Sequence, residues 1–209
     1  MAHHQRVRIR VHRIPFSTNV ERIAIACAYK RIDVEWIDHD PGDRSALEAL
    51  SGQSLVPVAE IDGRVVSDSP LILRDLERLV PQPPLWPTEP ARRAELDTFV
   101  DWFNGVWKVA PNRLADEPGA APARRAAWAA ELRDSRDRFE ALLEGRSFLF
   151  GDSLSAADVV AFPFLKYGML IEPDDDDLFH LVLAEHLGLG DAYPRLREWI
   201  GRCEGLPRA

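Results

Sequence analysis

The chain has 209 residues, of which 46% are apolar and 29% charged, the composition of a globular protein with a sizeable core. Its net charge of −8 and its pI near 5.3 argue against binding to a nucleic-acid backbone. No apolar run approaches the ~20 residues of a membrane span and the N-terminal residues lack the apolar core of a signal peptide, so we expect a cytoplasmic protein that does not bind membranes.

The first predicted element is a strand. Apolar and basic residues alternate with the period of two that is typical of strands, over Arg6, Val7, Arg8, Ile9, Arg10 and Val11. A strand at the centre of a sheet is expected to be apolar on both faces, and Arg8 and Arg10 do not fit that expectation. Either one face of the sheet is partly open or these two side chains extend outward to water.

A polar triplet, Ser17-Thr18-Asn19, separates this strand from an amphipathic helix predicted over 20–31. Thr18 or Asn19 can cap the helix, and capping alone would explain the triplet. A second strand follows at 34–37. A polar stretch with weak helical character at 45–50 then leads to the next block.

The block from Gln53 to Arg74 predicts a hairpin followed by a helix. Pro57 cannot donate to a sheet ladder, so we expect it at the start of a strand or in a special bend. The pair Asp62-Gly63 is typical of a two-residue hairpin turn. Ser69 is then predicted to cap a helix whose first residue is Pro70, and the open N-terminus of such a helix favours an anion.

Five prolines between positions 81 and 90 indicate a boundary between two structural units. We therefore predict domains at 1–82 and 91–209 with a linker at 83–90. The second domain is expected to be all helical, with helices over 92–109, where Pro111 ends or bends the helix, and over 123–144. Ser155 and Asp158 form a capping box at the start of a further buried helix, and a last helix begins near Tyr193.

The sequence gives no sign of a metal site or a disulfide scaffold. Cys27 and Cys203 lie far apart and form no CxxC pattern, and Cys27 is expected to be a small core residue. His180 and His186 are six positions apart and do not share a helical face. The acidic run Asp174–Asp177 lacks the alternating ligands and the glycine of a calcium loop, so we expect a solvated loop or helix start.

Two motifs in this order resemble the glutathione S-transferase family, and nearly the whole chain is covered. The N-terminal motif is V-P-V, then D-G, then D-S at a helix start. The C-terminal motif, G-x-x-[LF]-S-x-A-D, matches Gly151 to Asp158. The resemblance is to serine-type bacterial members. It implies a thioredoxin-like α/β N-terminal domain with a mixed four-stranded sheet and a cis-proline, followed by an all-α C-terminal bundle.

The resemblance also implies site residues. Val56, before a cis-Pro57, would pair with the cysteinyl part of glutathione, and Asp68 and Ser69 would bind its γ-glutamyl group. Asn19 and Gln53 are further candidates for glutathione contacts. In members with a Cys or Ser at the site, an Arg lies five residues downstream, and counting back from Arg22 gives Ser17. Its hydroxyl would donate to the glutathione sulfur, with Thr18 as the second candidate. The electrophile would lie between the domains, against Phe16, Trp102, Phe103, Val106 and Trp107, although an apolar stripe at helical spacing can equally form the core.

The implied function is that of a homodimeric glutathione transferase, with glutathione as co-substrate and no metal, that conjugates an apolar electrophile in detoxification. One alternative is a zeta-like cis–trans isomerase, whose Ser-Ser-Cys triplet is matched only in part by Ser17-Thr18-Asn19. Another is a non-catalytic binding protein that kept the fold. A different low-molecular-weight thiol in place of glutathione is a third.

Overall fold

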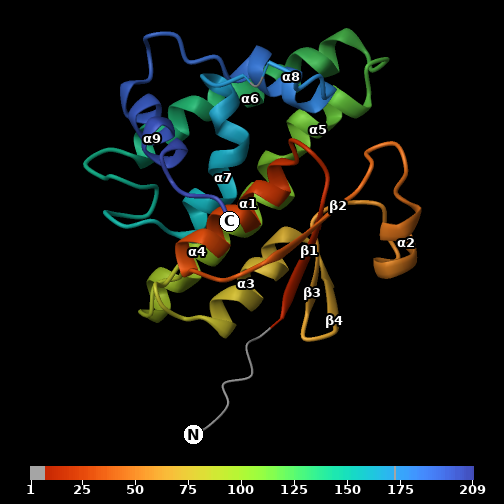
Figure 1. Cartoon of the computed structure of the whole chain (residues 1–209). Helices are drawn as coiled ribbons and strands as arrows, with labels where there is room; N and C mark the ends of the chain where they lie inside the picture. The colour runs from red at the N-terminus through yellow and green to blue at the C-terminus, as the bar shows by residue number, and fades with distance from the viewer. Residues whose placement is uncertain (1–7, 172) are drawn as a thin grey trace, which may run out of the picture. The chain divides into compact units, whose positions relative to one another are not determined.

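The computed structural model describes residues 8–171 and 173–209, so the predicted strand residues Arg6 and Val7 lie outside it. The chain divides into two compact units (Figure 1). Unit 1 runs to Pro84 and also contains Pro207–Ala209, whereas unit 2 is Leu85–Leu206.

Unit 1 is built on a four-stranded mixed sheet. Its elements are, in order, β1 (Ile9–Arg13), α1 (Thr18–Lys30), β2 (Glu35–Asp38), α2 (Ser45–Ser51), β3 (Val58–Ile61), β4 (Arg64–Ser67) and α3 (Ser69–Leu79). The strand order is β2-β1-β3-β4, with β1 parallel to β2 and antiparallel to β3, and with β3 antiparallel to β4. The thioredoxin-like arrangement expected from the resemblance is confirmed.

The hairpin and the cis-proline are both present. Asp62 and Gly63 have φ values of 48° and 83°, so both adopt the positive φ that a tight two-residue turn requires. The Val56-Pro57 peptide bond is cis. Strand β3 begins at Val58, directly after Pro57, which has no N–H to offer to a ladder and was expected at a strand start or in a bend.

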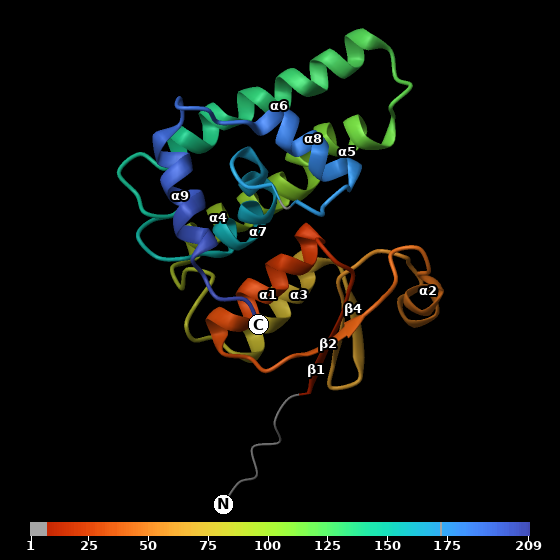
Figure 2. The ribbon, with the colours of Figure 1, turned by 45° about the horizontal axis from the view of Figure 1, so that its top comes forward.

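The two faces of the sheet differ in character, which resolves the conflict that the arginines of β1 created. One face buries Val11 and Ala59, and α1 and α3 lie side by side next to the sheet (Figure 2). On the other face Arg10 is paired with Glu60 at 2.8 Å. Arg8 pairs with Glu35 at 3.2 Å. This face is therefore a partly open, ion-paired surface instead of an apolar one.

Two groups of long-range contacts complete unit 1. The Lys30 side chain is buried, donates to the carbonyls of Val80 and Pro83 at 2.8 and 2.9 Å, and pairs with Glu77 at 2.5 Å. The last residues of the chain return to α1. There the amide of Ala209 donates to the Ala24 carbonyl at 3.1 Å, and the guanidinium of Arg208 donates to the Glu21 carboxylate at 2.8 Å.

Unit 2 is helical throughout its regular elements, as predicted. They are α4 (Pro90–Trp102), the π-helical turn η1 (Phe103–Trp107), α5 (Val109–Asp116), α6 (Pro122–Leu142), α7 (Ala156–Leu165), the 3₁₀ turn η2 (Lys166–Gly168), α8 (Leu178–Leu187) and α9 (Pro194–Glu204).

The first helix of unit 2 is not ended by Pro111. Instead the chain passes through η1, where the Lys108 amide donates to the carbonyl of Phe103, five residues back. Pro111 then lies inside α5. A proline within a helix removes one backbone donor and crowds the preceding turn, and the wider π-helical turn lies directly before that position.

The predicted capping box at the start of α7 is present and is part of a larger network. The Asp158 carboxylate is fully buried and accepts hydrogen bonds from the amide and hydroxyl of Ser155. It also accepts from the Leu149 amide and from the Trp199 indole, both at 2.8 Å. Asp158 therefore joins the start of α7 to α9 and to the loop before it.

The acidic run is not uniformly solvated, contrary to prediction. The Asp175 side chain is 1% exposed and accepts from the Tyr167 hydroxyl at 2.6 Å. It also pairs with His180 Nδ1 at 2.7 Å. Asp177 caps α8 by accepting from the Phe179 amide, so the predicted helix start is correct for that residue.

Candidate thiol-binding site

The central feature of the site is a buried contact between the first turns of α1 and α3. Arg22, on α1, is completely buried, and its Nη1 atom donates to the Ser69 hydroxyl at 3.0 Å. The same hydroxyl donates to the Asn19 side-chain oxygen at 3.3 Å. Ser69 is the first residue of α3, so these bonds bring two helix N-termini to one place in unit 1.

The start of α1 presents a serine hydroxyl. Ser17 is the N-cap residue, and its Oγ accepts from the Val20 amide at 3.3 Å. A hydroxyl that accepts in this way keeps its own proton for donation elsewhere. Thr18 is buried, 4% exposed, whereas Ser17 is only partly covered. Phe16 precedes them with a positive φ of 58° and is 46% exposed.

The start of α3 differs by one residue from the prediction. Asp68 is the N-cap residue and Ser69 already belongs to the helix, so Pro70 is its second residue and not its first. Asp68 has a φ of 80°, which turns the chain out of β4 and leaves its side chain without a capping bond. The hydroxyl of Ser69 is thereby free of the capping role and bonds to Arg22 instead.

The electrostatics of this contact favour an anionic ligand. Burial lowers the pKa of Arg22 to about 9, and the Asp68 carboxylate opposes that shift. The guanidinium is thus still charged at neutral pH. The first N–H groups of α3 have no acceptor within their own helix, and a helix N-terminus stabilises negative charge. Together these donors suit a carboxylate.

The segment directly before β3 contains three more of the predicted site residues, Gln53, Val56 and Pro57. Val56 is buried in an apolar cluster with Val20, Leu47 and Val58. The side-chain amide of Gln53 donates to the carbonyl of Leu55 at 3.0 Å. Val56 precedes the cis bond and lies just outside β3, so its backbone is not part of the strand ladder.

The predicted electrophile wall in unit 2 is not one surface. Phe103 and Trp107 are buried, stack at 4.4 Å between ring centroids, and pack on Phe139 and Phe164. The prediction that these two rings line an open wall is therefore corrected, because they form the aromatic core of unit 2. Val106 is 50% exposed.

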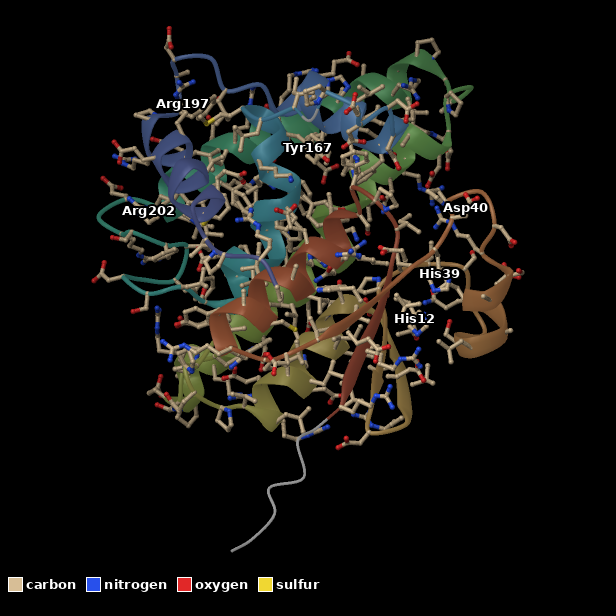
Figure 3. All side chains as sticks on the ribbon, viewed as in Figure 1. His12, His39, Asp40, Tyr167, Arg197 and Arg202 are labelled. Atoms are coloured by element: carbon tan, nitrogen blue, oxygen red, sulfur yellow. The ribbon has the colours of Figure 1, made fainter. Side chains whose placement is uncertain are left out.

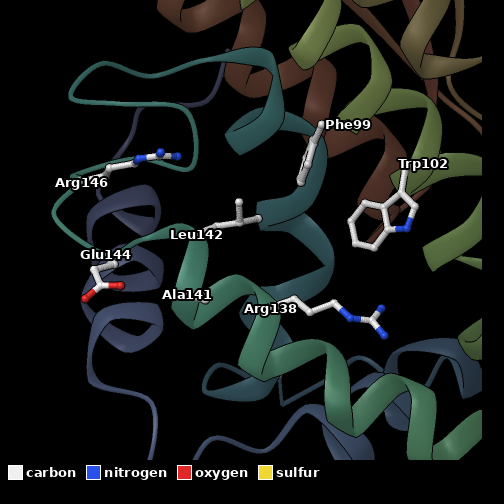
Figure 4. A pocket seen from close by; sticks show the side chains of 7 residues that line it. All are labelled: Phe99, Trp102, Arg138, Ala141, Leu142, Glu144 and Arg146. Carbon is white, nitrogen blue, oxygen red and sulfur yellow. The ribbon is translucent and has the colours of Figure 1, made fainter.

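Trp102 faces a different part of unit 2. With Phe99 it lines a pocket of about 560 Å³ against the C-terminal end of α6 (Figure 4). The remaining lining residues are Arg138, Ala141, Leu142, Glu144 and Arg146. Phe16 belongs to unit 1 and is exposed there.

In the sequence Arg22 only indicates the position of Ser17, whereas in the structure Arg22 itself bonds to Ser69. The available signal was a single arginine in the buried part of an apolar helix. A pair of histidines, His12 and His39, on the polar face of the sheet was not predicted either; both are labelled in Figure 3. Their contact joins a residue of β1 to the residue that follows β2, and it has no local sequence pattern. The prediction for Cys27 is confirmed, since it is buried, and burial raises the pKa of its thiol to about 12.

Within residues 8–171 and 173–209, no group of three or more His, Cys, Asp or Glu side chains is arranged to hold a metal ion. None of the helices in this described part is both long and apolar enough to cross a membrane.

Comparisons with known proteins agree on one family. Residues 11–84 match the model for the glutathione S-transferase N-terminal domain, and residues 122–202 match the model for the C-terminal domain. The chain is 28% identical over 160 residues to a probable maleylacetoacetate isomerase 1 of Drosophila melanogaster, covering 69% of this chain and 63% of that protein. It is 27% identical over 194 residues to the maleylacetoacetate isomerase of Pseudomonas aeruginosa, covering 87% and 84%.

Among solved structures, rice GST1 in complex with glutathione superposes with a TM-score of 0.76 at 23% identity, covering 96% of this chain and 88% of that one. This likeness supports the fold. The two family models cover both halves of the chain, and the protein belongs to the glutathione S-transferase family.

Proposed function

We propose that this protein is a glutathione transferase that binds glutathione in unit 1 and stabilises its thiolate with the Ser17 hydroxyl. The observation that carries the proposal is the Arg22–Ser69–Asn19 contact, which brings the first turns of α1 and α3 together. The γ-glutamyl carboxylate would bind the N-terminus of α3 and Ser69. The Asp68 carboxylate would meet the amino group.

The chemistry requires a lowered thiol pKa. A free thiol has a pKa of about 8.5 and is mostly protonated at neutral pH. A hydroxyl that donates to sulfur, next to the positive end of a helix, favours the thiolate. One observation supports Ser17 in this role: its Oγ accepts from the Val20 amide, which leaves the hydroxyl proton available for donation. The thiolate would then attack the electrophile and form a C–S bond. In a displacement the leaving group departs with the electron pair of the broken bond, and in an addition the π electrons of the double bond move to the conjugated carbonyl oxygen and the product takes up a proton from water.

A second candidate function has its own support. The named relatives include maleylacetoacetate isomerases, and in an isomerase the thiol would add to the substrate and be released again. Thr18 and Asn19 stand where zeta-like members have Ser and Cys, so the triplet differs from theirs. Conversion of a maleyl acid without consumption of glutathione would identify the isomerase. Consumption with a model electrophile would identify the transferase.

The decisive experiment is a calorimetric titration with glutathione, with the thiolate absorbance recorded on the same samples. We expect wild type to bind, Ser69→Ala to bind at least about tenfold more weakly, and Ser17→Ala to bind but lose the thiolate signal. Thr18→Val tests the second candidate for thiol activation. Ser153→Ala, an exposed serine of unit 2, is the matched control and should behave as wild type.

No binding at millimolar glutathione would reject the proposal and would leave a protein of this fold that uses another thiol or none. Binding without any thiolate signal in wild type would instead support a non-catalytic glutathione-binding protein. We infer further that the protein acts as a homodimer in the cytoplasm. Sedimentation at several concentrations tests the dimer.

A further inference from the structure

The polar face of the sheet in unit 1 carries a row of three hydrogen-bonded side chains that the site described above does not include. His12 lies in β1, and His39 follows β2. His12 Nδ1 and His39 Nε2 are 2.8 Å apart. On its other side, His12 Nε2 lies 3.0 Å from a Glu60 carboxylate oxygen. His12 is 7% exposed, so the middle of the row is shielded from water (Figure 3).

This row can take up one extra proton with all its hydrogen bonds intact, whereas a second proton breaks the bond between the histidines. The ionised Glu60 carboxylate can only accept, so His12 Nε2 carries a hydrogen. In the neutral pair, His39 Nε2–H donates to the lone pair of His12 Nδ1. A first added proton on the outer nitrogen of His39 leaves that bond intact. A second puts hydrogens on both facing nitrogens, which removes the bond and places two positive charges in contact.

The surrounding charged groups influence the pH at which the two histidines are protonated. Arg10 shares the Glu60 carboxylate at 2.8 Å from β1. At the end of β2 Asp38 is held by Arg13 at 2.7 Å. The residue of β4 opposite Val58 is an uncharged serine. Burial lowers the pKa of His39 from its ordinary value of 6.5, the charge of His12 lowers it further, and Asp38 opposes both. His39 therefore takes up a proton at a lower pH than an ordinary imidazole, and a second proton on the already charged pair requires a lower pH still.

His39 stands at the start of the segment that leads through α2 to the thiol site. Its amide donates to the Arg13 carbonyl at 2.9 Å, next to the histidine contact. Further along, Leu47 of α2 packs in the apolar cluster that contains Val56. Arg44 Nη1 also bonds to the Ser54 carbonyl at 3.2 Å. The arrangement of residues 39–55 is thus linked to the backbone before Pro57 by direct contacts.

We propose that the His12–His39 contact is a proton-dependent connection that holds residues 39–55 in their binding arrangement, which makes His39 a positioning residue for glutathione. This proposal rests on the proposed function of the site. At a pH above that of the second protonation, the His12–His39 contact is intact and residues 39–55 are held in place. At a lower pH the contact is lost, residues 39–55 become more mobile, and the affinity for glutathione falls.

The test uses S-methylglutathione, which has no ionisable thiol, so that the titration of the ligand's sulfur does not enter. Its affinity is measured by calorimetry from about pH 7.5 to about pH 5. We expect wild type to lose about tenfold in affinity over this range, on the scale of one charged hydrogen bond. His39→Gln can still donate to His12 but does not titrate, so it should bind as wild type does at pH 7.5 and lose little at pH 5. His186→Gln, a histidine of unit 2, is the control and should keep the wild-type pH profile.

Two further readouts separate this proposal from the function on which it rests. Imidazole NMR signals of the two histidines should show two coupled protonation steps, and amide exchange of residues 39–55 should accelerate only below the second step. Independent single-step titrations, or the same pH profile in wild type and His39→Gln, would overturn the proposal. If S-methylglutathione does not bind at pH 7.5, the proposed function is rejected, and with it the role of His39 as a positioning residue for glutathione. The exchange data still decide whether the histidine contact holds the segment.

Discussion

The Arg22 guanidinium and the Ser69 hydroxyl lie 3.0 Å apart in the interior of unit 1, although 47 positions separate them in the sequence. The bond joins the first turn of α3 to α1, so it serves both stability and the geometry of the proposed ligand site. Neither residue can be changed without an effect on the other, because both are buried.

Ser69→Ala should lower the free energy of unfolding by about 1–3 kcal/mol, since it removes the buried hydroxyl that accepts from Arg22 Nη1. Urea unfolding followed by circular dichroism measures the change. In a double-mutant cycle with Arg22→Gln, we expect a coupling of about 0.5–3 kcal/mol. Additive effects of the two substitutions would show that the bond contributes nothing to stability.

Asp158→Ala should destabilise the protein by about 3–5 kcal/mol, more than the loss of an ordinary helix cap. The reason is that the Leu149 amide and the Trp199 indole lose a buried acceptor together with Ser155. Ser155→Ala removes the hydroxyl only and should cost about 0.5–2 kcal/mol. Equal unfolding midpoints for the two variants would contradict the network.

Asp175 should make stability depend on pH under acidic conditions. Burial raises the pKa of its carboxyl, but the hydrogen bonds from Tyr167 and His180 outweigh burial, so the pKa lies below its ordinary 3.8. Since the folded pKa is depressed, the contribution is complete above pH 3.8 and is lost as the pH falls through the folded value. Unfolding of wild type and Asp175→Asn should therefore converge at low pH. A constant difference between them across the acidic range would exclude this contribution.

Lys30→Met should destabilise unit 1 by about 3–5 kcal/mol, because it leaves the Glu77 carboxylate and the carbonyls of Val80 and Pro83 without a buried cation. Adding Glu77→Met to this variant should restore part of the loss, since the carboxylate that loses its Lys30 partner is then removed as well. Thermal unfolding compares the three proteins. A double variant as unstable as the single one would assign the whole effect to the two carbonyls.

Local patterns predicted the parts of this fold that depend on local physics. The Asp62-Gly63 turn, the capping box of Ser155 and Asp158, and the helical second half follow from backbone preferences and periodicity. The cis bond before Pro57 came from the family resemblance, because most such bonds are trans.

The errors involve contacts between distant positions. An apolar stripe looks the same whether it lines a pocket or fills a core, and only the burial of Phe103 and Trp107 distinguishes the two possibilities. Nothing near Asp175 in the sequence indicates that Tyr167 and His180 bury its charge. The glutamates that pair with Arg10 come from neighbouring strands, and only the register of the sheet reveals them.

The return of Pro207–Ala209 to unit 1 has a consequence for limited proteolysis. A single cut among the prolines that follow α3 would produce a fragment that contains all of unit 2 and still carries the tail bonded to α1. The nicked chain has to break those tail contacts before its pieces can separate. An isolated N-terminal fragment ending at Pro84, in turn, would lack the residues that bond to Glu21 and Ala24 in the intact protein.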